Sequence, residues 1–219
     1  MIPLLALPLI LWLASGKAEA AASPAAASPA AAPPKVFARI LGIAQDGGVP
    51  HLGCAKECCL AARRDPAGAP HVASVALVVE AMDAPRRVFI IDATPDLRAQ
   101  IDMALSPDGY ASRPPGLPVD GFLLTHAHIG HYLGLVYLGR EAMGAAAVPV
   151  HATARMSAFL SGNGPWKRLV DGRNIDLRVM TPGSAVTLAP GLSVTPFRVP
   201  LREEESDVVG FLVIGPARR

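Results

Sequence analysis

Three histidines stand close together at the end of an apolar run, in the stretch LLTHAHIGHYLGL at residues 123–135. His126 and His128 are two positions apart, so in an extended segment both side chains face the same side. His131 reaches the same space if a helix begins near Gly130. Imidazole suits zinc, iron and similar ions, so this spacing predicts a transition-metal site. The alternative is a set of partly exposed loop histidines, or one hydrogen-bonded core histidine.

Short runs rich in Val, Ile, Leu and Phe, bounded by Gly, Pro and Asp, predict the buried strands that would position these histidines. Helices are predicted between them, so the order of elements favours a mixed sheet with helices outside. Thr94 and Pro95 mark one helix start, followed by an apolar stripe of Leu97, Ile101 and Leu105. Two more helices are predicted at 131–144 and 153–162. The predicted strands are 36–44, 71–80, 87–92, 119–125, 148–152, 175–180, 185–188, 192–200 and 207–215.

The first residues predict export. Residues 1–22 contain an apolar run that is too short and too proline-broken to span a bilayer, followed by small residues, which is typical of a cleaved signal peptide. No Lys or Arg precedes the run, which leaves an uncleaved anchor as the alternative. Residues 23–35 are an Ala/Pro/Ser linker. We therefore expect one domain over 36–219, periplasmic or secreted, without a membrane span after processing.

The balance of basic and acidic residues indicates which class of molecule the chain binds. The chain carries 20 basic and 18 acidic residues, for a net charge of +2, and no basic run stands out. A nucleic-acid partner is therefore not expected, and a small-molecule substrate is.

The segment THAHIGH resembles the signature His-x-His-x-Asp-His of the metallo-β-lactamase-fold metallohydrolases. Further motifs, LGIAQDGGVPHLGCAKECC, IDATPD, LTHAHIGHYLGLVYLGREAMGA and VTPFRVPLREEESDVVGF, resemble a subgroup related to the pyrroloquinoline-quinone biosynthesis B proteins. The resemblance runs from Val36 to the end of the chain. It implies an α/β (α+β) fold, an αββα sandwich with the metal site at one edge between two sheets.

The resemblance also implies roles for single residues. His126 and His128 match ligands of a first metal, and His131 matches a ligand of a second. Gly130 stands where most of the family has a ligating Asp, and Leu201 stands where the subgroup is expected to have a third histidine. Zinc is the expected cofactor, as one or two ions with weakened affinity, or another divalent metal in its place.

Two further residues are candidates for roles beside these ligands. Asp92, at the end of a strand, is expected to accept a hydrogen bond from an imidazole N–H, with a purely structural strand-end role as the alternative. His151 is a substitute for the missing histidine or, on the simpler interpretation, a strand histidine.

The resemblance implies a C-terminally truncated domain. The family places further ligands beyond the strand VGFLVIG, whereas this sequence ends at GPARR. The second sheet would then be incomplete, with an apolar edge that a partner, such as a second copy in a homodimer, would cover.

Cys54, Cys58 and Cys59 form a second cluster, near a predicted helix start. Their spacing fits a structural zinc site, which the resemblance favours. In an oxidising compartment, a disulfide with one leftover thiol competes with it, and buried thiols are the third alternative. The preceding QDGGVP predicts a glycine-permitted turn. An orientation of Asp46 towards the metal pocket is a further hypothesis.

Two functions follow from the sequence. One is a metal-dependent hydrolase that uses metal-bound water on an ester, lactone or amide-type bond. The other is a non-catalytic or defective relative with a binding or structural role. Gly130, Leu201 and the early end favour the second, and the combined motifs favour the first.

Overall fold

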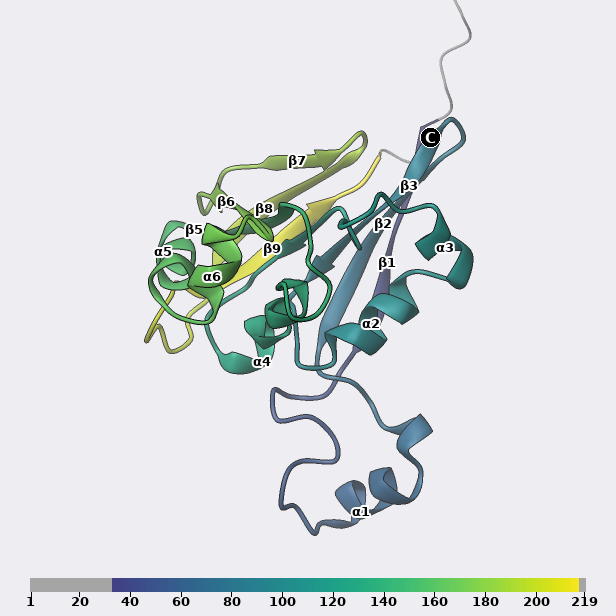
Figure 1. Ribbon diagram of the computed structural model, residues 1–219, viewed down its shortest axis with the longest axis vertical. Coiled ribbons are helices and arrows are strands. Elements are labelled where there is room, and N and C mark those ends of the chain that lie inside the picture. The colour runs from purple at the N-terminus through teal and green to yellow at the C-terminus, as the bar shows by residue number, and fades with distance from the viewer. Residues whose placement is uncertain (1–32, 217–219) are drawn as a thin grey trace, which may run out of the picture. The chain divides into compact units, whose positions relative to one another are not determined.

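Two β-sheets form the framework of residues 33–216, the part of the chain that the computed structural model describes (Figure 1). The strands run in the order β1-β2-β3-β4-β5-β6 in the larger sheet and β7-β8-β9 in the smaller one. The larger sheet contains β1 (Lys35–Gly42), β2 (Ser74–Ala81), β3 (Ala84–Ile91), β4 (Gly121–Leu123), β5 (Val148–Thr153) and β6 (Ile175–Met180). The smaller sheet contains β7 (Val186–Ala189), β8 (Leu192–Arg198) and β9 (Val209–Ile214).

Short helices connect these strands. Those that pack on the larger sheet are α2, which contacts β1, and α5 and α6, which contact β6. The helices are α1 (Glu57–Arg64), α2 (Leu97–Ala104), α3 (Pro107–Ala111), α4 (Ile129–Tyr132), α5 (Ala154–Gly162) and α6 (Trp166–Asp171), with 3₁₀ turns η1 (Pro66–Gly68) and η2 (Leu133–Leu138).

Strand direction brings several strand ends to one edge of the larger sheet. β1 and β3 both pair antiparallel with β2, and β3, β4, β5 and β6 pair in parallel. The carboxyl ends of β1, β3, β4 and β5 therefore lie at the same edge. In sheets of this kind ligands bind outside the carboxyl ends of the strands.

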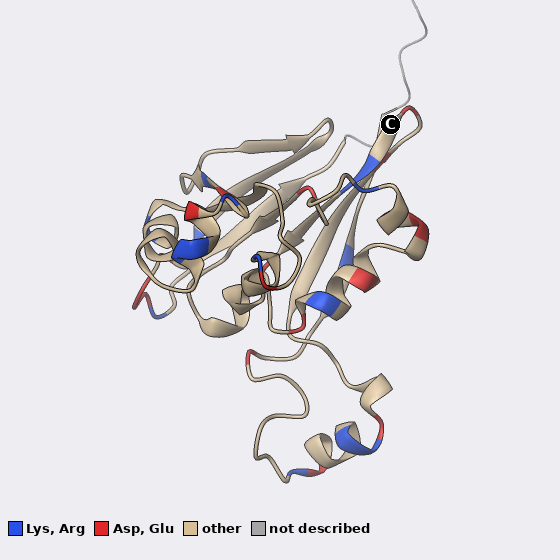
Figure 2. Cartoon of the chain, viewed as in Figure 1, with Lys and Arg blue, Asp and Glu red and all other residues tan. Residues whose placement is uncertain are grey.

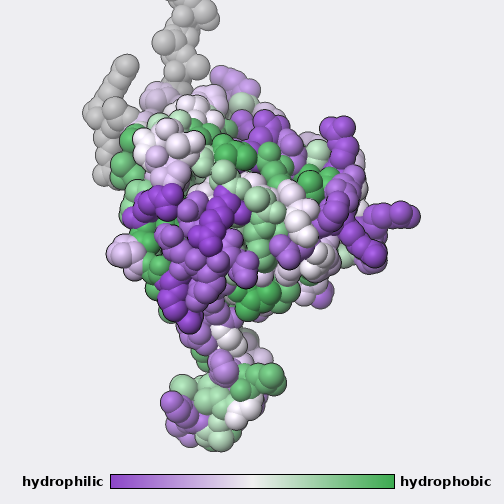
Figure 3. All heavy atoms as spheres, turned by 90° about the vertical axis from the view of Figure 1, so that its left-hand side faces the viewer, coloured by the Kyte–Doolittle hydropathy of each residue, from purple (hydrophilic) through white to green (hydrophobic). Residues whose placement is uncertain are grey.

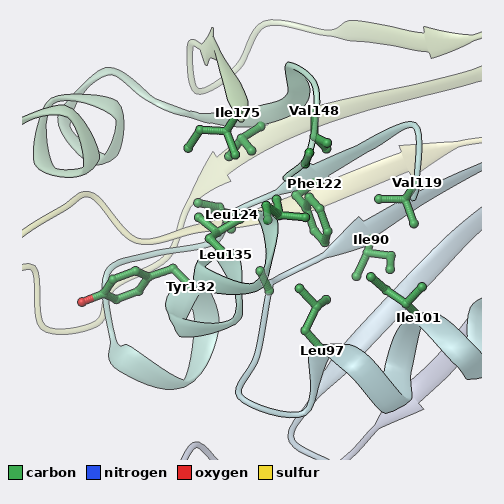
Figure 4. Close-up of a cluster of buried hydrophobic side chains, with 14 of the residues drawn as sticks. Ile90, Leu97, Ile101, Val119, Phe122, Leu124, Tyr132, Leu135, Val148 and Ile175 are labelled. Atoms are coloured by element: carbon green, nitrogen blue, oxygen red, sulfur yellow. The ribbon is translucent and has the colours of Figure 1, made fainter. Parts of the chain in front are cut away.

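The core has two layers, one on each face of the larger sheet. Ile90 and Phe122 are fully buried on the face that the helices cover, where they meet Leu97 of α2 (Figure 4). Their neighbours Phe89 and Leu123 are buried on the opposite face, against the smaller sheet. This period-two alternation places one sheet between helices and a second sheet. The predicted mixed α/β sandwich is thereby confirmed.

The nine predicted strands are present, but the helix after β3 begins later than predicted. Asp96, rather than Thr94, occupies the N-cap position of α2. The Thr94 hydroxyl instead accepts a hydrogen bond from the Asp96 N–H at 3.1 Å and donates one to Gln100 Oε1 at 2.7 Å. The prediction of Thr94 as the helix cap is wrong because its hydroxyl belongs to a buried polar network.

The helix predicted at 131–144 is also shorter than expected. It is divided into α4 and the 3₁₀ turn η2. The Gly134 N–H donates to the Ala93 carbonyl at 2.8 Å, and a Cβ at position 134 would stand 2.2 Å from the Thr94 carbonyl oxygen. Glycine permits this close approach, and the Gly134 N–H is thereby bonded outside the helix, where the predicted helix would have continued. The sequence patterns did not predict α3 and α6.

Predictions for the first residues lie mostly outside the described part of the chain, which excludes the signal peptide predicted at 1–22 and most of the linker at 23–35. Lys35, assigned to the linker, is the first residue of β1. Within residues 33–216, no helix has both the length and the apolar character that a bilayer crossing requires. Basic and acidic residues are interspersed along the ribbon (Figure 2).

The smaller sheet exposes apolar side chains. Leu212 and Ile214 of β9 are 55% and 51% exposed, and Phe197 of β8 is 49% exposed. A space-filling view shows apolar patches between hydrophilic ones on one face (Figure 3). Coverage of this sheet by a partner stays a prediction.

Candidate metal centre

The three predicted ligand histidines lie together beyond the carboxyl end of β4. His126 follows the strand, His128 is the N-cap residue of α4, and His131 lies inside that helix. The ring centroids of His126 and His128 are 4.4 Å apart, and those of His126 and His131 are 4.2 Å apart. The fold thus brings together the residues that the sequence spacing singled out.

Each ring has one nitrogen in a hydrogen bond to a neighbouring oxygen. Such contacts select the tautomer and fix the ring plane, as they do around protein metal sites. The three contacts are Thr125 Oγ1 to His126 Nδ1 at 2.8 Å, Glu204 Oε2 to His128 Nε2 at 3.3 Å, and Asp92 Oδ2 to His131 Nδ1 at 2.7 Å.

The other nitrogen of each ring faces a neighbouring ring or a carboxylate within the cluster. His126 Nε2 is 2.9 Å from His128 Nδ1, and His131 Nε2 is 3.1 Å from Asp46 Oδ1. A hydrogen bond between two ring nitrogens needs one proton, which a metal ion would replace. Within residues 33–216, no three His, Cys, Asp or Glu side chains form a preformed metal cage.

Asp92 lies against the histidine cluster, in contact with His131. It has a left-handed backbone conformation with φ of 65°, and it is 4% exposed. This conformation is costly for a residue other than glycine, and such strain often lies at functional sites. Its carboxylate accepts hydrogen bonds from the Thr125 N–H at 2.8 Å and the Thr125 hydroxyl at 3.0 Å. Its Oδ2 atom also lies 2.7 Å from His131 Nδ1, and a role for Asp92 in orienting a metal-binding imidazole stays a prediction.

Burial and neighbouring charges set different pKa values for two of the histidines. Burial, together with the other two imidazoles, lowers the pKa of His126 to about 4, so this ring is neutral near pH 7. Burial also acts to lower the pKa of His131, but Asp92 and Asp46 outweigh it and raise that pKa. A neutral imidazole is the form that binds a metal.

The loop between β8 and β9 closes one side of the cluster. Leu201, at the place of the expected third histidine, is 51% exposed. The same loop supplies the Ser206 hydroxyl, which accepts a hydrogen bond from the Ala127 N–H at 2.8 Å. Arg202, Glu204 and Glu205 of this loop line a hollow of about 130 Å³ beside His126 and His128.

The sequence did not identify Glu204 or Ser206. The run REEES contains several equivalent acidic residues, and nothing in it separates the one that contacts His128.

His151 and the cysteines lie in other surroundings. His151 belongs to β5, where burial and the nearby Arg178 lower its pKa. The three cysteines are free thiols, of which Cys59 is buried and Cys58 exposed. Their contacts are local: the Cys59 sulfur accepts the His51 N–H at 3.3 Å, and the Cys54 sulfur accepts the Lys56 N–H at 3.4 Å. A structural zinc at Cys54, Cys58 and Cys59 stays a prediction.

The histidine cluster contains the donor atoms of a zinc site, arranged as two close pairs. Zinc ligands lie about 2.0–2.2 Å from the metal in a tetrahedral site, so two ligands of one ion stand about 3.3–3.6 Å apart. His126 Nε2 and His128 Nδ1 are 2.9 Å apart, and His131 Nε2 and Asp46 Oδ1 are 3.1 Å apart, so each pair would have to open by a few tenths of an ångström or more to bind one ion. Imidazole nitrogen and carboxylate oxygen are also donors that zinc accepts.

Several known proteins are similar to this chain. The coenzyme PQQ synthesis protein B of Rhodopseudomonas palustris (strain TIE-1) is 32% identical over 168 residues, which are 74% of this chain and 51% of that protein. The protein of the same name from Gluconobacter oxydans (strain 621H) is 38% identical over 102 residues, 45% of this chain and 31% of its own. The chain thus spans about half the length, or less, of these curated relatives.

Solved structures and a family model agree with this similarity. The zinc-bound PqqB of Methylobacterium extorquens has a TM-score of 0.61 and 28% identity, over 81% of this chain and 58% of its own. A diphosphatase of the PhnP family, at 23% identity and a TM-score of 0.55 over 82% of this chain and 62% of its own, shares the fold. The model of the β-lactamase superfamily domain matches residues 87–219, which include all three histidines. The chain therefore belongs to the β-lactamase superfamily.

Proposed function

We propose that the chain is a metal-dependent hydrolase that acts on an ester, lactone or amide-type bond of a small molecule. The observation that carries this proposal is the orientation of the three imidazoles. Each has one nitrogen held by an oxygen of the protein, and the other nitrogen faces into the cluster. Rings fixed in this way are ready to bind a metal with little loss of side-chain freedom.

The residues of the cluster have separate roles in this proposal. His126 Nε2, His128 Nδ1 and His131 Nε2 would hold the metal. Asp92 and Thr125 orient His131 and His126, and Glu204 orients His128. When bound, a zinc ion acts as a Lewis acid and makes water a nucleophile near neutral pH.

The surroundings support a small-molecule substrate. A cavity of about 560 Å³ lies against the turn that carries Asp46, with His71, Arg63 and Asp96 also on its wall. This volume is in the range of small-molecule sites. His71 and Asp96 approach to 3.6 Å, and the Arg63 guanidinium donates to the carbonyls of His51 and Cys54, so the wall is polar. Asp46 is the residue that this cavity shares with the histidine cluster.

A second candidate is a metal-binding relative without turnover. Gly130 and the exposed Leu201 favour it, because neither can supply a ligand side chain at the place the signature expects. The names of the relatives add a role in coenzyme PQQ synthesis as the context for this candidate.

Hydrolysis by metal-loaded protein distinguishes the two. The zinc-loaded chain is assayed on a panel of generic esters and lactones beside His126→Ala/His128→Ala. We expect turnover that disappears in the double variant while the circular dichroism spectrum is retained. Zinc binding without turnover on any substrate would favour the non-catalytic relative, and equal turnover in both proteins would refute the site.

A further inference from the structure

Gly130 packs directly against Asp46 in the folded chain. Gly130 stands where the signature that THAHIGH resembles has an aspartate. A Cβ built at position 130 would lie 2.6 Å from Asp46 Cβ, 2.7 Å from Asp46 Cα and 2.8 Å from Asp46 Cγ. Non-bonded atoms do not approach so closely. The position of Asp46, backbone included, is therefore compatible with glycine at position 130 and with no larger residue there.

The Asp46 carboxylate points at the histidine cluster. Its Oδ1 atom lies 3.1 Å from His131 Nε2, although the two residues are 85 positions apart in the chain. The turn that carries it follows β1, and two hydrogen bonds anchor that turn to the segment before β2. Ala44 N donates to the His71 carbonyl at 2.9 Å, and Ala73 N donates to the Ala44 carbonyl at 2.8 Å.

His131 is placed between two carboxylates. Its Nδ1 atom contacts the buried Asp92, so Asp46 is a second carboxylate on one imidazole. Asp92 fixes the ring and leaves Nε2 and Asp46 Oδ1 facing each other. A cation between these two atoms would satisfy both.

We propose that Asp46 supplies the carboxylate ligand that Gly130 cannot, so that Asp46 Oδ1 and His131 Nε2 bind one metal ion together. This inference rests on the proposed function, because it needs metal at the histidine cluster. It adds a ligand that lies 85 positions before His131 in the chain. It also explains how the site keeps both oxygen and nitrogen donors without the aspartate of the signature. The glycine and the aspartate are one compensating pair.

Exchange of the two residues tests the pairing. Zinc affinity is measured by competition with a chromophoric chelator, and zinc content by elemental mass spectrometry, for the wild type, Asp46→Asn, Gly130→Asp and Asp46→Gly/Gly130→Asp. We expect Asp46→Asn to weaken zinc binding at least tenfold. The exchange variant restores part of that affinity, because the loss of the Asp46 side chain opens space for the new carboxylate but leaves the Cα of residue 46 at 2.7 Å from a Cβ at position 130. Gly130→Asp alone forces two side chains into one space and lowers the melting temperature.

The outcomes separate this inference from the proposed function. Unchanged zinc affinity in Asp46→Asn, with zinc still lost in His126→Ala/His128→Ala, overturns the role of Asp46 and leaves the proposed function intact. If the exchange variant melts at the wild-type temperature and binds zinc no more tightly than Asp46→Asn, the compensation is overturned. A wild-type chain that binds no zinc at the histidines overturns both.

Discussion

Nδ1 of His131 and a carboxylate oxygen of Asp92 are 2.7 Å apart, and this contact decides which nitrogen of the ring faces Asp46 and the other histidines. The two residues come from different parts of the fold, because Asp92 directly follows β3 and His131 lies in α4. A backbone hydrogen bond from Ala93 N to the His131 carbonyl, at 2.9 Å, holds the same two segments together. The orientation of the ring is therefore built into the fold.

Replacement of Asp92 by asparagine should weaken metal binding without unfolding the chain. Asparagine keeps the shape and tolerates the positive φ, but it lacks the charge that holds the His131 N–H. Loss of such a partner typically costs about 10–100-fold in metal affinity. Asp120→Asn is the control, since Asp120 is a part-buried carboxylate paired with Arg113 at 2.8 Å. Equal zinc affinity in Asp92→Asn and wild type would contradict the positioning role.

The stability of the chain should fall as the pH drops below about 6.5, in part because of His151. Burial and Arg178 lower the pKa of His151 from its ordinary value of 6.5. The unfolded chain then takes up this proton first as the pH falls, so protonation favours unfolding. Urea denaturation of metal-free protein at pH 7.5 and 5.5 should show a smaller loss for His151→Gln. Equal losses in the two proteins would show that His151 does not titrate in this way.

The helix-side core should be sensitive to cavities. Leu97 is fully buried between α2 and the larger sheet. Leu97→Ala should lower the free energy of unfolding by about 2–5 kcal/mol, because it removes apolar contacts and leaves a void. Leu212→Ala, at a position 55% exposed in β9, is the comparison and should change that free energy little. Similar losses in both would mean that β9 is covered in solution.

The positions of the strands could be read largely from the sequence, because a strand buried on both faces is a run of apolar residues, as with Phe89 and Ile90 on opposite sides of one sheet. The first residues of the helices were harder to predict. Thr94 resembles a cap in sequence, but its hydroxyl is held by Gln100 and Asp96 in a buried network that exists only in the folded chain.

The candidate site also combines residues that the sequence spacing predicts with residues that it does not. The histidines are close in sequence, so their convergence follows from local geometry. The other contacts come from loops that are far from the histidines in sequence, and tertiary packing alone brings them to the cluster. These residues are Asp46, Glu204 and Ser206. Spacing carries no information about such contacts.

The measurement that tests the central claim most directly is the metal content per chain, by elemental mass spectrometry. Wild type, His126→Ala/His128→Ala and Cys54→Ser/Cys58→Ser are each loaded with zinc and dialysed against buffer without metal. We predict that zinc is lost with the histidine pair and that the histidine-site zinc stays when the cysteines are replaced. Zinc lost only with the cysteines, or the same zinc content in wild type and the histidine variant, would contradict a metal centre at the histidines.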